Sequence, residues 1–330
     1  MTTRPQTSHF VLATCAALAC TALAAIAHPG QGASKASASS ATVERPRWLA
    51  VDRLQGSGIA IVGSEVYVAN DRAGADANTI EVFNRNATGE SSPPLRKIVL
   101  DVSHPAIADP AKKKYYEVRV CKEGATCDPL DIEDLAVDGA GAIYVSVEGR
   151  PDCVIKFDPK SYRAVDVWGD VTGDQGNLGA EGLAVTPDGT YIFVGHQHPA
   201  EISVINTKTT WVSKGPIEMA EICGLAYDGA KKELLVLDAT VPEIVRITLD
   251  GRVLERYAIG TGADLDPSGK RYVGVKFDAI ALGPAGNAVW LVTDPPHDPS
   301  HPYGPADKGA TVPDGFVKGY SMLYRVRLGR

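Results

Sequence analysis

Carboxylates recur at one position of a repeated sequence motif. The motif alternates aliphatic residues with alanine, and it occurs at 58–61, 134–137, 182–185, 224–227 and 279–282. The position just before each copy holds Ser57, Glu133, Glu181, Cys223 and Asp278. Carboxylates at equivalent positions repel one another where repeats converge, unless a cation, protons or hydrogen-bond donors compensate their charge.

Each motif is followed by a turn and a second β-rich run. Polar residues stand at the ends of these runs: Asp71, Glu148, His196, Asp238 and Asp294. If the two runs are antiparallel strands, the end of the second lies beside the start of the first. The sequence therefore predicts two nested polar rings at one face of the molecule.

A hard divalent cation would suit the inner ring. Calcium accepts six to eight oxygen ligands in flexible geometry, so Glu133, Glu181 and Asp278, completed by water and carbonyl oxygens, form the predicted calcium site. The alternative is structural, because acidic residues at such positions also hold turns by accepting backbone N–H groups. For any single residue we favour this structural role. For the three residues taken together we favour binding of a cation.

The fold that would bring these residues together is all-β. Short β-rich runs are separated by Gly, Pro, Asn and Asp, and three runs follow one another in each unit. Two of the four intervals between motifs have the roughly 40 to 50 residues of common blade repeats, and the other two are longer because they carry insertions. We expect a β-propeller of about five four-stranded blades, with six as the alternative. The last unit lacks a fourth strand, which the run Trp48–Val51 supplies and so closes the ring.

The N-terminus has the pattern of an export signal. Residues 1–27 form a predicted signal peptide with an apolar run and a small-x-small end, residues 28–45 a flexible linker, and residues 46–330 the propeller domain. A retained anchor and a lipoprotein attached through Cys20 are the less favoured alternatives. The expected location is secreted or periplasmic, and no span of the mature chain is apolar enough to cross a membrane.

Three sequence segments resemble those of known families. Residues 131–136, 181–189 and 224–228 resemble the SdiA-regulated propellers and the phytase-like, or esterase-like, propellers. The resemblance implies calcium-dependent hydrolysis of a small-molecule ester or phosphoester. His196, Glu148 and Asp238 are then the candidate catalytic residues, with His196 the acid–base candidate because imidazole titrates near neutral pH. The candidate substrate-binding residues are Asp71, Arg72, Arg150 and Asp294.

A non-catalytic binding or scaffold propeller that recognises an envelope protein is the alternative function. The chain has no Gly-x-Ser-x-Gly elbow, phosphate-binding glycine loop or dinucleotide fingerprint. The formal net charge of −7 also argues against nucleic acid as a partner, since a polyanion would be repelled.

Cysteine spacing gives a further prediction. In an oxidising compartment, the short spacer between Cys121 and Cys127 permits a loop-closing disulfide, whereas Cys153 and Cys223 are expected to be buried thiols. Two long insertions, at 101–130 and 295–320, are expected to cover the acidic face of the ring.

Overall fold

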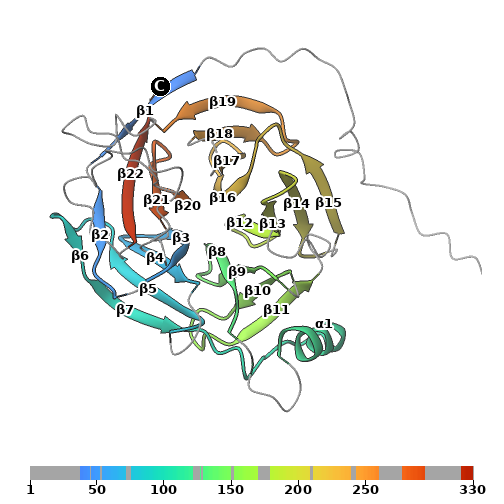
Figure 1. The fold of residues 1–330 in the computed structure, drawn as a ribbon. Helices are drawn as coiled ribbons and strands as arrows, with labels where there is room; N and C mark the ends of the chain where they lie inside the picture. Colours follow the sequence, from blue (N-terminus) through green and yellow to red (C-terminus); the bar gives the residue numbers. More distant parts are fainter. Residues whose placement is uncertain are drawn as a thin grey trace, which may run out of the picture. The chain divides into compact units, whose positions relative to one another are not determined.

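Five β-sheets form the blades of a β-propeller in the computed structural model (Figure 1). The propeller prediction is therefore confirmed, with five blades rather than six. The structure describes residues 38–44, 46–52, 54–71, 76–121, 127, 129–149, 152–169, 179–208, 211–238, 243–259, 277–293 and 321–329. Neither helix in this part of the chain has the length and hydropathy to span a bilayer.

Each blade is built from consecutive antiparallel strands, numbered outward from the axis. Blade 1 contains β3 (Gly56–Val62), β4 (Glu65–Asn70), β5 (Thr79–Asn84) and β7 (Pro94–Val99), with the short β6 (Ser91–Ser92) preceding β7. Blade 2 contains β8 (Ile132–Val137), β9 (Ile143–Val147), β10 (Cys153–Phe157) and β11 (Ala164–Gly169). Blade 3 contains β12 (Ala180–Val185), β13 (Tyr191–His196), β14 (Glu201–Asn206) and β15 (Trp211–Pro216).

The last two blades meet the N-terminal segment. Blade 4 contains β16 (Ile222–Asp228), β17 (Glu233–Asp238), β18 (Glu243–Thr248) and β19 (Val253–Ala258). Blade 5 contains β20 (Phe277–Leu282), β21 (Ala288–Thr293) and β22 (Met322–Leu328). Its outer strand comes from β1 (Ala38–Val43) and β2 (Arg47–Leu49), which both pair antiparallel with β22.

The turns between the two inner strands follow from local chemistry. In blade 2 the Asp138 carboxylate accepts the N–H groups of Ala140 and Ala142, each at 2.9 Å. Gly141 adopts a φ of 87°, which favours glycine because it has no Cβ. Asp188 and Asp228 accept turn N–H groups in blades 3 and 4. These aspartates are structural, as side chains that cap turns commonly are.

The N-terminal segment closes the ring, as the sequence predicts. Trp48 of β2 pairs with Met322 of β22, and β2 continues into a parallel pairing with β6 of blade 1. One correction concerns residues 38–43, which fall in the predicted linker but form β1. They join the fold because β1 also pairs with β19 of blade 4, and Ala41 and Val43 pack against the core. A composition rich in serine and alanine does not reveal such pairing partners.

The five innermost strands meet around a single carboxylate. The first residues of the repeated motifs are Gly58, Asp134, Gly182, Gly224 and Ala279. A Cβ on Gly58 would lie 2.6 Å from the Leu135 nitrogen, and one on Gly224 would lie 2.9 Å from the Ile280 nitrogen. The axis therefore has room for one larger side chain at this level, and Asp134 supplies it.

Asp134 is fully buried and joins three blades. Its Oδ2 accepts the Leu183 N–H at 2.7 Å, and its Oδ1 accepts the N–H groups of Leu135 at 2.8 Å and Ile59 at 3.4 Å. Burial raises the pKa of Asp134 well above its usual value, while backbone N–H groups, including that of Leu225 in blade 4, oppose the rise. The carboxyl group thus ties the inner strands together.

The first long insertion packs beside blade 2. It contains α1 (Pro110–Tyr115) and the π-helical turn η1 (Tyr116–Val120). Lys112 of α1 pairs with Asp166 of β11 at 2.6 Å, and Figure 1 shows α1 next to that outer strand. This helix does not form the predicted lid over the acidic face. The insertion at 295–320 lies outside the described residues.

The cysteine prediction is confirmed. Cys121 and Cys127 form a disulfide that joins the end of η1 to the chain leading into blade 2. Cys153 and Cys223 are buried thiols. The Cys223 Sγ lies 3.2 Å from the Phe277 carbonyl oxygen, so the side chain fills space between blades 4 and 5.

We expect Asp134→Ala to lower the free energy of unfolding by about 3 kcal/mol or more, because buried N–H groups from several blades lose their acceptor. Urea unfolding followed by circular dichroism measures the change. Asp158→Ala is the matched control, since Asp158 also accepts two backbone N–H groups, from Lys160 and Ser161, but in an exposed turn. Equal losses from the two variants would contradict the central role of Asp134.

Candidate functional site

The repeat position that carries the inner carboxylates is a β-bulge. The pairing between the two inner strands shifts at Glu133, Glu181, Cys223 and Asp278, each of which is an extra residue on its strand. In blade 1 the shift spans Ser57 and Gly58. A bulge bends the strand and re-aims a side chain, so this one repeat position presents its side chain differently from the rest of the strand. The sequence identified the equivalence of these five residues but not its cause.

The second set of predicted residues does not share one repeat position. His196 and Asp238 pair with the residue just before the bulge in their blades, whereas Asp71 and Glu148 lie one residue beyond the corresponding pairs. The prediction that these residues form a single outer ring at one repeat position is therefore wrong by one residue. A run of apolar residues in the sequence does not show at which residue the strand ends. Arg72, Arg150 and Asp294 lie outside the described residues.

His196 and Asp238 are buried within their own blades. The His196 Nε2 lies 2.7 Å from the Ser203 Oγ of the neighbouring strand β14. The Asp238 Oδ2 accepts the Ala220 N–H, just before β16, at 3.0 Å. These contacts connect neighbouring segments of one blade, and the predicted catalytic roles of the two residues stay predictions.

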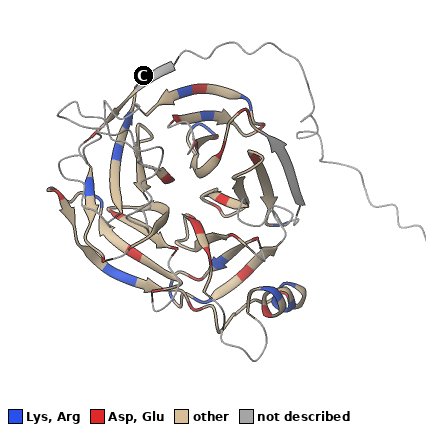
Figure 2. Cartoon of the chain, in the orientation of Figure 1, with Lys and Arg blue, Asp and Glu red and all other residues tan. Residues whose placement is uncertain are grey.

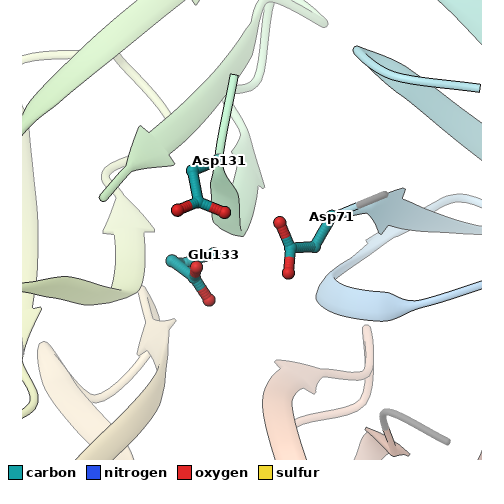
Figure 3. A group of neighbouring side chains, drawn as sticks. All are labelled: Asp71, Asp131 and Glu133. Atoms are coloured by element: carbon teal, nitrogen blue, oxygen red, sulfur yellow. The ribbon is translucent and has the colours of Figure 1, made fainter. Parts of the chain in front are cut away.

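Three carboxylates do converge, at the junction of blades 1 and 2. Asp71 follows β4, Asp131 precedes β8, and Glu133 occupies the β8 bulge. One carboxylate oxygen from each lies within 4.8 Å of the others. Figure 3 shows the three groups pointing toward a common space, so the group could hold a metal ion.

Backbone hydrogen bonds fix the positions of the main-chain segments that carry these side chains. The Asp71 N–H donates to the Gln55 carbonyl at 3.0 Å, and the Glu148 N–H donates to the Asp131 carbonyl at 2.9 Å. These bonds extend the ladder between the inner strands by one residue beyond the regular pairing. The carboxylates are therefore held by rigid strand ends, which suits a preorganised site.

The charge at this junction extends beyond the three residues. Burial raises the pKa of Glu133 well above its usual value, and the negative charges of Glu181, Asp71, Glu148 and Asp131 raise it further. The Glu148 Oε1 accepts the Gly179 N–H at 2.8 Å, and Glu181 is buried. Figure 2 shows acidic segments on the inner strands around the centre of the ring. Four neighbouring acidic side chains thus raise the pKa of Glu133.

The chemistry of the group fits a hard cation. Carboxylate oxygens are the preferred ligands of Ca²⁺ and Mg²⁺, and a group made only of acceptors cannot satisfy itself by hydrogen bonding. Asp71, Asp131 and Glu133 are the residues that would hold such an ion, with Glu181 and Glu148 nearby. Of the three predicted metal ligands, Glu133 is part of this group of described residues, whereas Glu181 and Asp278 are not.

Sequence reasoning missed Asp131. It stands two residues before the bulge, where the sequences of the other four blades have Gln55, Gly179, Glu221 and Lys276. A search for repeat positions at which most blades have a carboxylate does not find Asp131, because most blades have another kind of residue there. The pattern Asp-x-Glu directly before an inner strand was the available signal, because alternate residues of an extended chain point the same way.

Comparison with known proteins agrees with this architecture. Residues 54–208 match the family Phytase-like, described as esterase-like activity of phytase. The phytase-like resemblance is thus confirmed. The matched segment contains Asp71, Asp131 and Glu133, and it covers the junction of blades 1 and 2. The resemblance to SdiA-regulated propellers stays a prediction, and no curated protein matches the chain.

One solved structure adds support for the fold alone. Glutaminyl cyclase from Myxococcus xanthus aligns with 88% of this chain and 97% of its own, at a TM-score of 0.53 and 11% identity. Hydrazine synthase from Kuenenia stuttgartiensis (14% identity, 78% and 61% of the chains, TM-score 0.43) and virginiamycin B lyase from Staphylococcus aureus (13%, 76% and 67%, 0.41) align less closely.

The raised pKa of Glu133 gives a pH prediction. Without added cation the folded state keeps this proton to a higher pH than the unfolded state does, so stability should fall as pH rises above about 4.5, the ordinary value. The fall should end once pH exceeds the raised pKa. Thermal unfolding of chelator-treated protein between pH 4 and pH 8 measures it.

Glu133→Gln should flatten this pH dependence, because the amide does not titrate. Glu218→Gln, which alters an exposed glutamate between β15 and β16, should leave it unchanged. Added calcium should restore stability at high pH in the wild type. An unchanged profile in Glu133→Gln would show that Glu133 titrates normally.

Proposed function

We propose that the chain is an exported hydrolase of small esters or phosphoesters that depends on a divalent cation, with calcium as the ion. The observation that carries the proposal is the convergence of Asp71, Asp131 and Glu133 within a segment similar to the phytase-like family. The family description supports an esterase-like reaction. The three converging carboxylates support a cation.

Calcium is proposed over softer metals because the group offers only oxygen. It is proposed over magnesium because ligands supplied by two separate blades suit an ion with flexible coordination, whereas magnesium demands near-ideal octahedral geometry. A bound divalent cation would polarise the ester oxygen and lower the pKa of a water molecule.

The chain's own acidic groups would handle the proton. Glu133 is one of the proposed ligands, and a bound cation favours the ionised form of a carboxyl group, so Glu133 would serve as a ligand rather than as the acid or base. Glu148 lies close enough to influence Glu133 and is tied to Gly179. We therefore assign proton transfer to Glu148, one of the residues predicted as catalytic, and propose that His196 and Asp238 instead hold segments of their own blades in position.

Export is part of the proposal. The apolar N-terminal run would deliver the chain to an oxidising compartment, and the Cys121–Cys127 disulfide suits such a compartment. Extracellular calcium-binding modules work at calcium concentrations of roughly 0.1 to 1 mM, so secretion or a periplasmic location would suit the proposed ion.

A non-catalytic propeller that binds an envelope protein is the second candidate. It is favoured by the burial of His196 and its contact with Ser203, since this histidine is not then available to substrate at the acidic site. In that case the cation would hold blades 1 and 2 together and the loops would recognise the partner.

Calcium-dependent hydrolysis tests the proposal. Chelator-treated protein should hydrolyse p-nitrophenyl acetate or p-nitrophenyl phosphate only after calcium is added. Asp131→Asn should weaken calcium binding in calorimetric titration by about tenfold or more, because a charged ligand is lost, and should lower hydrolysis with it. Glu218→Gln should change neither.

Circular dichroism establishes that Asp131→Asn is folded. Calcium binding without hydrolysis of either compound would favour the scaffold candidate. A wild type that takes up neither calcium nor magnesium would remove the cation from both candidates.

A further inference from the structure

A second site lies where the first and last blades meet. A pocket of about 670 Å³ lies there. It is enclosed by the segment from the end of β1 to β2, the loop after β5, the turn between β20 and β21, and strand β22. This volume is within the usual range of small-molecule sites, roughly 300 to 1,000 Å³. We call it the seam pocket, and its walls include Arg47, Arg85, Trp290 and Arg325.

Three arginines from separate segments contribute to the seam pocket. Arg47 lies on β2, Arg85 just after β5, and Arg325 on β22. Figure 2 shows basic segments on the neighbouring strands β2 and β22. In a chain whose formal net charge is −7, this concentration of guanidinium groups is a local reversal of charge.

Two carboxylates, Glu44 and Glu90, line the pocket together with these three arginines, so they do not fully balance the positive charge. Glu44 lies 3.2 Å from the Arg325 Nη1 and 2.6 Å from the Arg327 Nε, so one carboxylate serves two arginines. Arg47 donates to the carbonyl oxygens of Ala87 and Arg85, which are uncharged acceptors. Burial lowers the pKa of Arg47 and the Arg325 charge lowers it further, while Glu44 opposes both. The guanidinium groups are thus close enough to repel.

Trp290 holds two of the guanidinium groups in position. The Arg325 and Arg85 Cζ atoms lie 5.2 Å and 5.8 Å from the centre of its ring, which is cation–π distance. Trp290 is 5% exposed, and its Nε1 has no hydrogen-bond partner within the described part of the chain. The Arg85 Nη1 is also buried without such a partner. The wall of the pocket therefore has two arginines held against Trp290, and three guanidinium groups face two carboxylates around it.

We propose that the seam pocket binds a phosphate group carried by a small organic molecule. The planar fork of arginine matches phosphate oxygens, with two parallel N–H donors to each pair. A phosphate monoester carries up to two negative charges, which would offset the surplus better than a single carboxylate does. The volume exceeds what bare phosphate fills, and the polar loop of residues 86–90 would face the organic part.

This site is independent of the acidic site. It has the opposite charge and lies between blades 5 and 1, whereas Asp71, Asp131 and Glu133 lie between blades 1 and 2. Because Arg47, Arg85 and Arg325 come from both ends of the chain's propeller, a bound phosphate group would also link the strands that close the ring. Binding should therefore raise the unfolding temperature.

The test is calorimetric titration of the whole, chelator-treated protein with glucose 6-phosphate. Inorganic phosphate and glucuronate are the comparison ligands. We expect saturable binding of glucose 6-phosphate at one site, weaker binding of inorganic phosphate, and weaker binding of glucuronate. Arg85→Gln and Arg325→Gln should each weaken the binding of glucose 6-phosphate by about tenfold or more, because each removes charge-assisted hydrogen bonds.

Arg252→Gln is the matched control. It removes the same charge from an exposed position in the hairpin between β18 and β19 and should leave binding unchanged. Arg85→Lys separates charge from geometry, since it keeps the charge and loses the fork, and should bind with intermediate affinity. Circular dichroism and the unfolding temperature without ligand show that each variant is folded.

Several results would overturn the proposal. Absence of saturable binding of glucose 6-phosphate would do so, as would equal weakening by Arg252→Gln and Arg85→Gln. Binding of glucuronate more tightly than glucose 6-phosphate would assign the pocket to carboxylates instead. Equal affinity for inorganic phosphate and glucose 6-phosphate would show that the pocket does not recognise the organic part of the ligand.

Discussion

The Asp134 carboxylate is the contact on which the geometry of the inner ring depends. It accepts N–H groups from β3, β8 and β12 in a space where Gly58, Gly182 and Gly224 leave no room for other side chains. Blades that approach this closely bring the starts of their inner strands together at one mouth of the channel. The charge crowded around Glu133 is a consequence of this approach, because the bulge position directly precedes the position of Asp134.

The ring has a second constraint at its closure. Blade 5 obtains its outer strand from β1 and β2, so the two ends of the propeller are joined by backbone pairing rather than by a covalent link. The pairing extends on both sides, to β19 of blade 4 and β6 of blade 1. Edge strands that would otherwise template aggregation are thereby covered. The same arrangement brings Arg47 and Arg325 within reach of each other, although they stand far apart in the sequence.

The repeats make the fold predictable, while the site is predictable only in part. Periodic aliphatic residues and turn-forming aspartates recur five times, so the strands, the blade number and the closure by Trp48 follow from comparison within one chain. Strand ends do not repeat in the same way. Runs of apolar residues do not show at which residue the pairing of the two inner strands ends in each blade. Comparison of the runs alone therefore aligns His196 with Asp71, although their places in the pairing differ by one residue.

A repeated contact between blades shows how one junction differs from the others. At the junction of blades 2 and 3, the Glu148 carboxylate accepts the Gly179 N–H, and at the next junction the Gln197 Nε2 donates to the Glu221 carboxylate at 2.6 Å. Both pairs match a donor with an acceptor. The equivalent residues between blades 1 and 2 are Asp71 and Asp131, which are both acceptors. A contact that stabilises two junctions by hydrogen bonding thus becomes, through a change of side chain, one that a cation can complete. The binding site is in this sense a variant of the contact that holds neighbouring blades together.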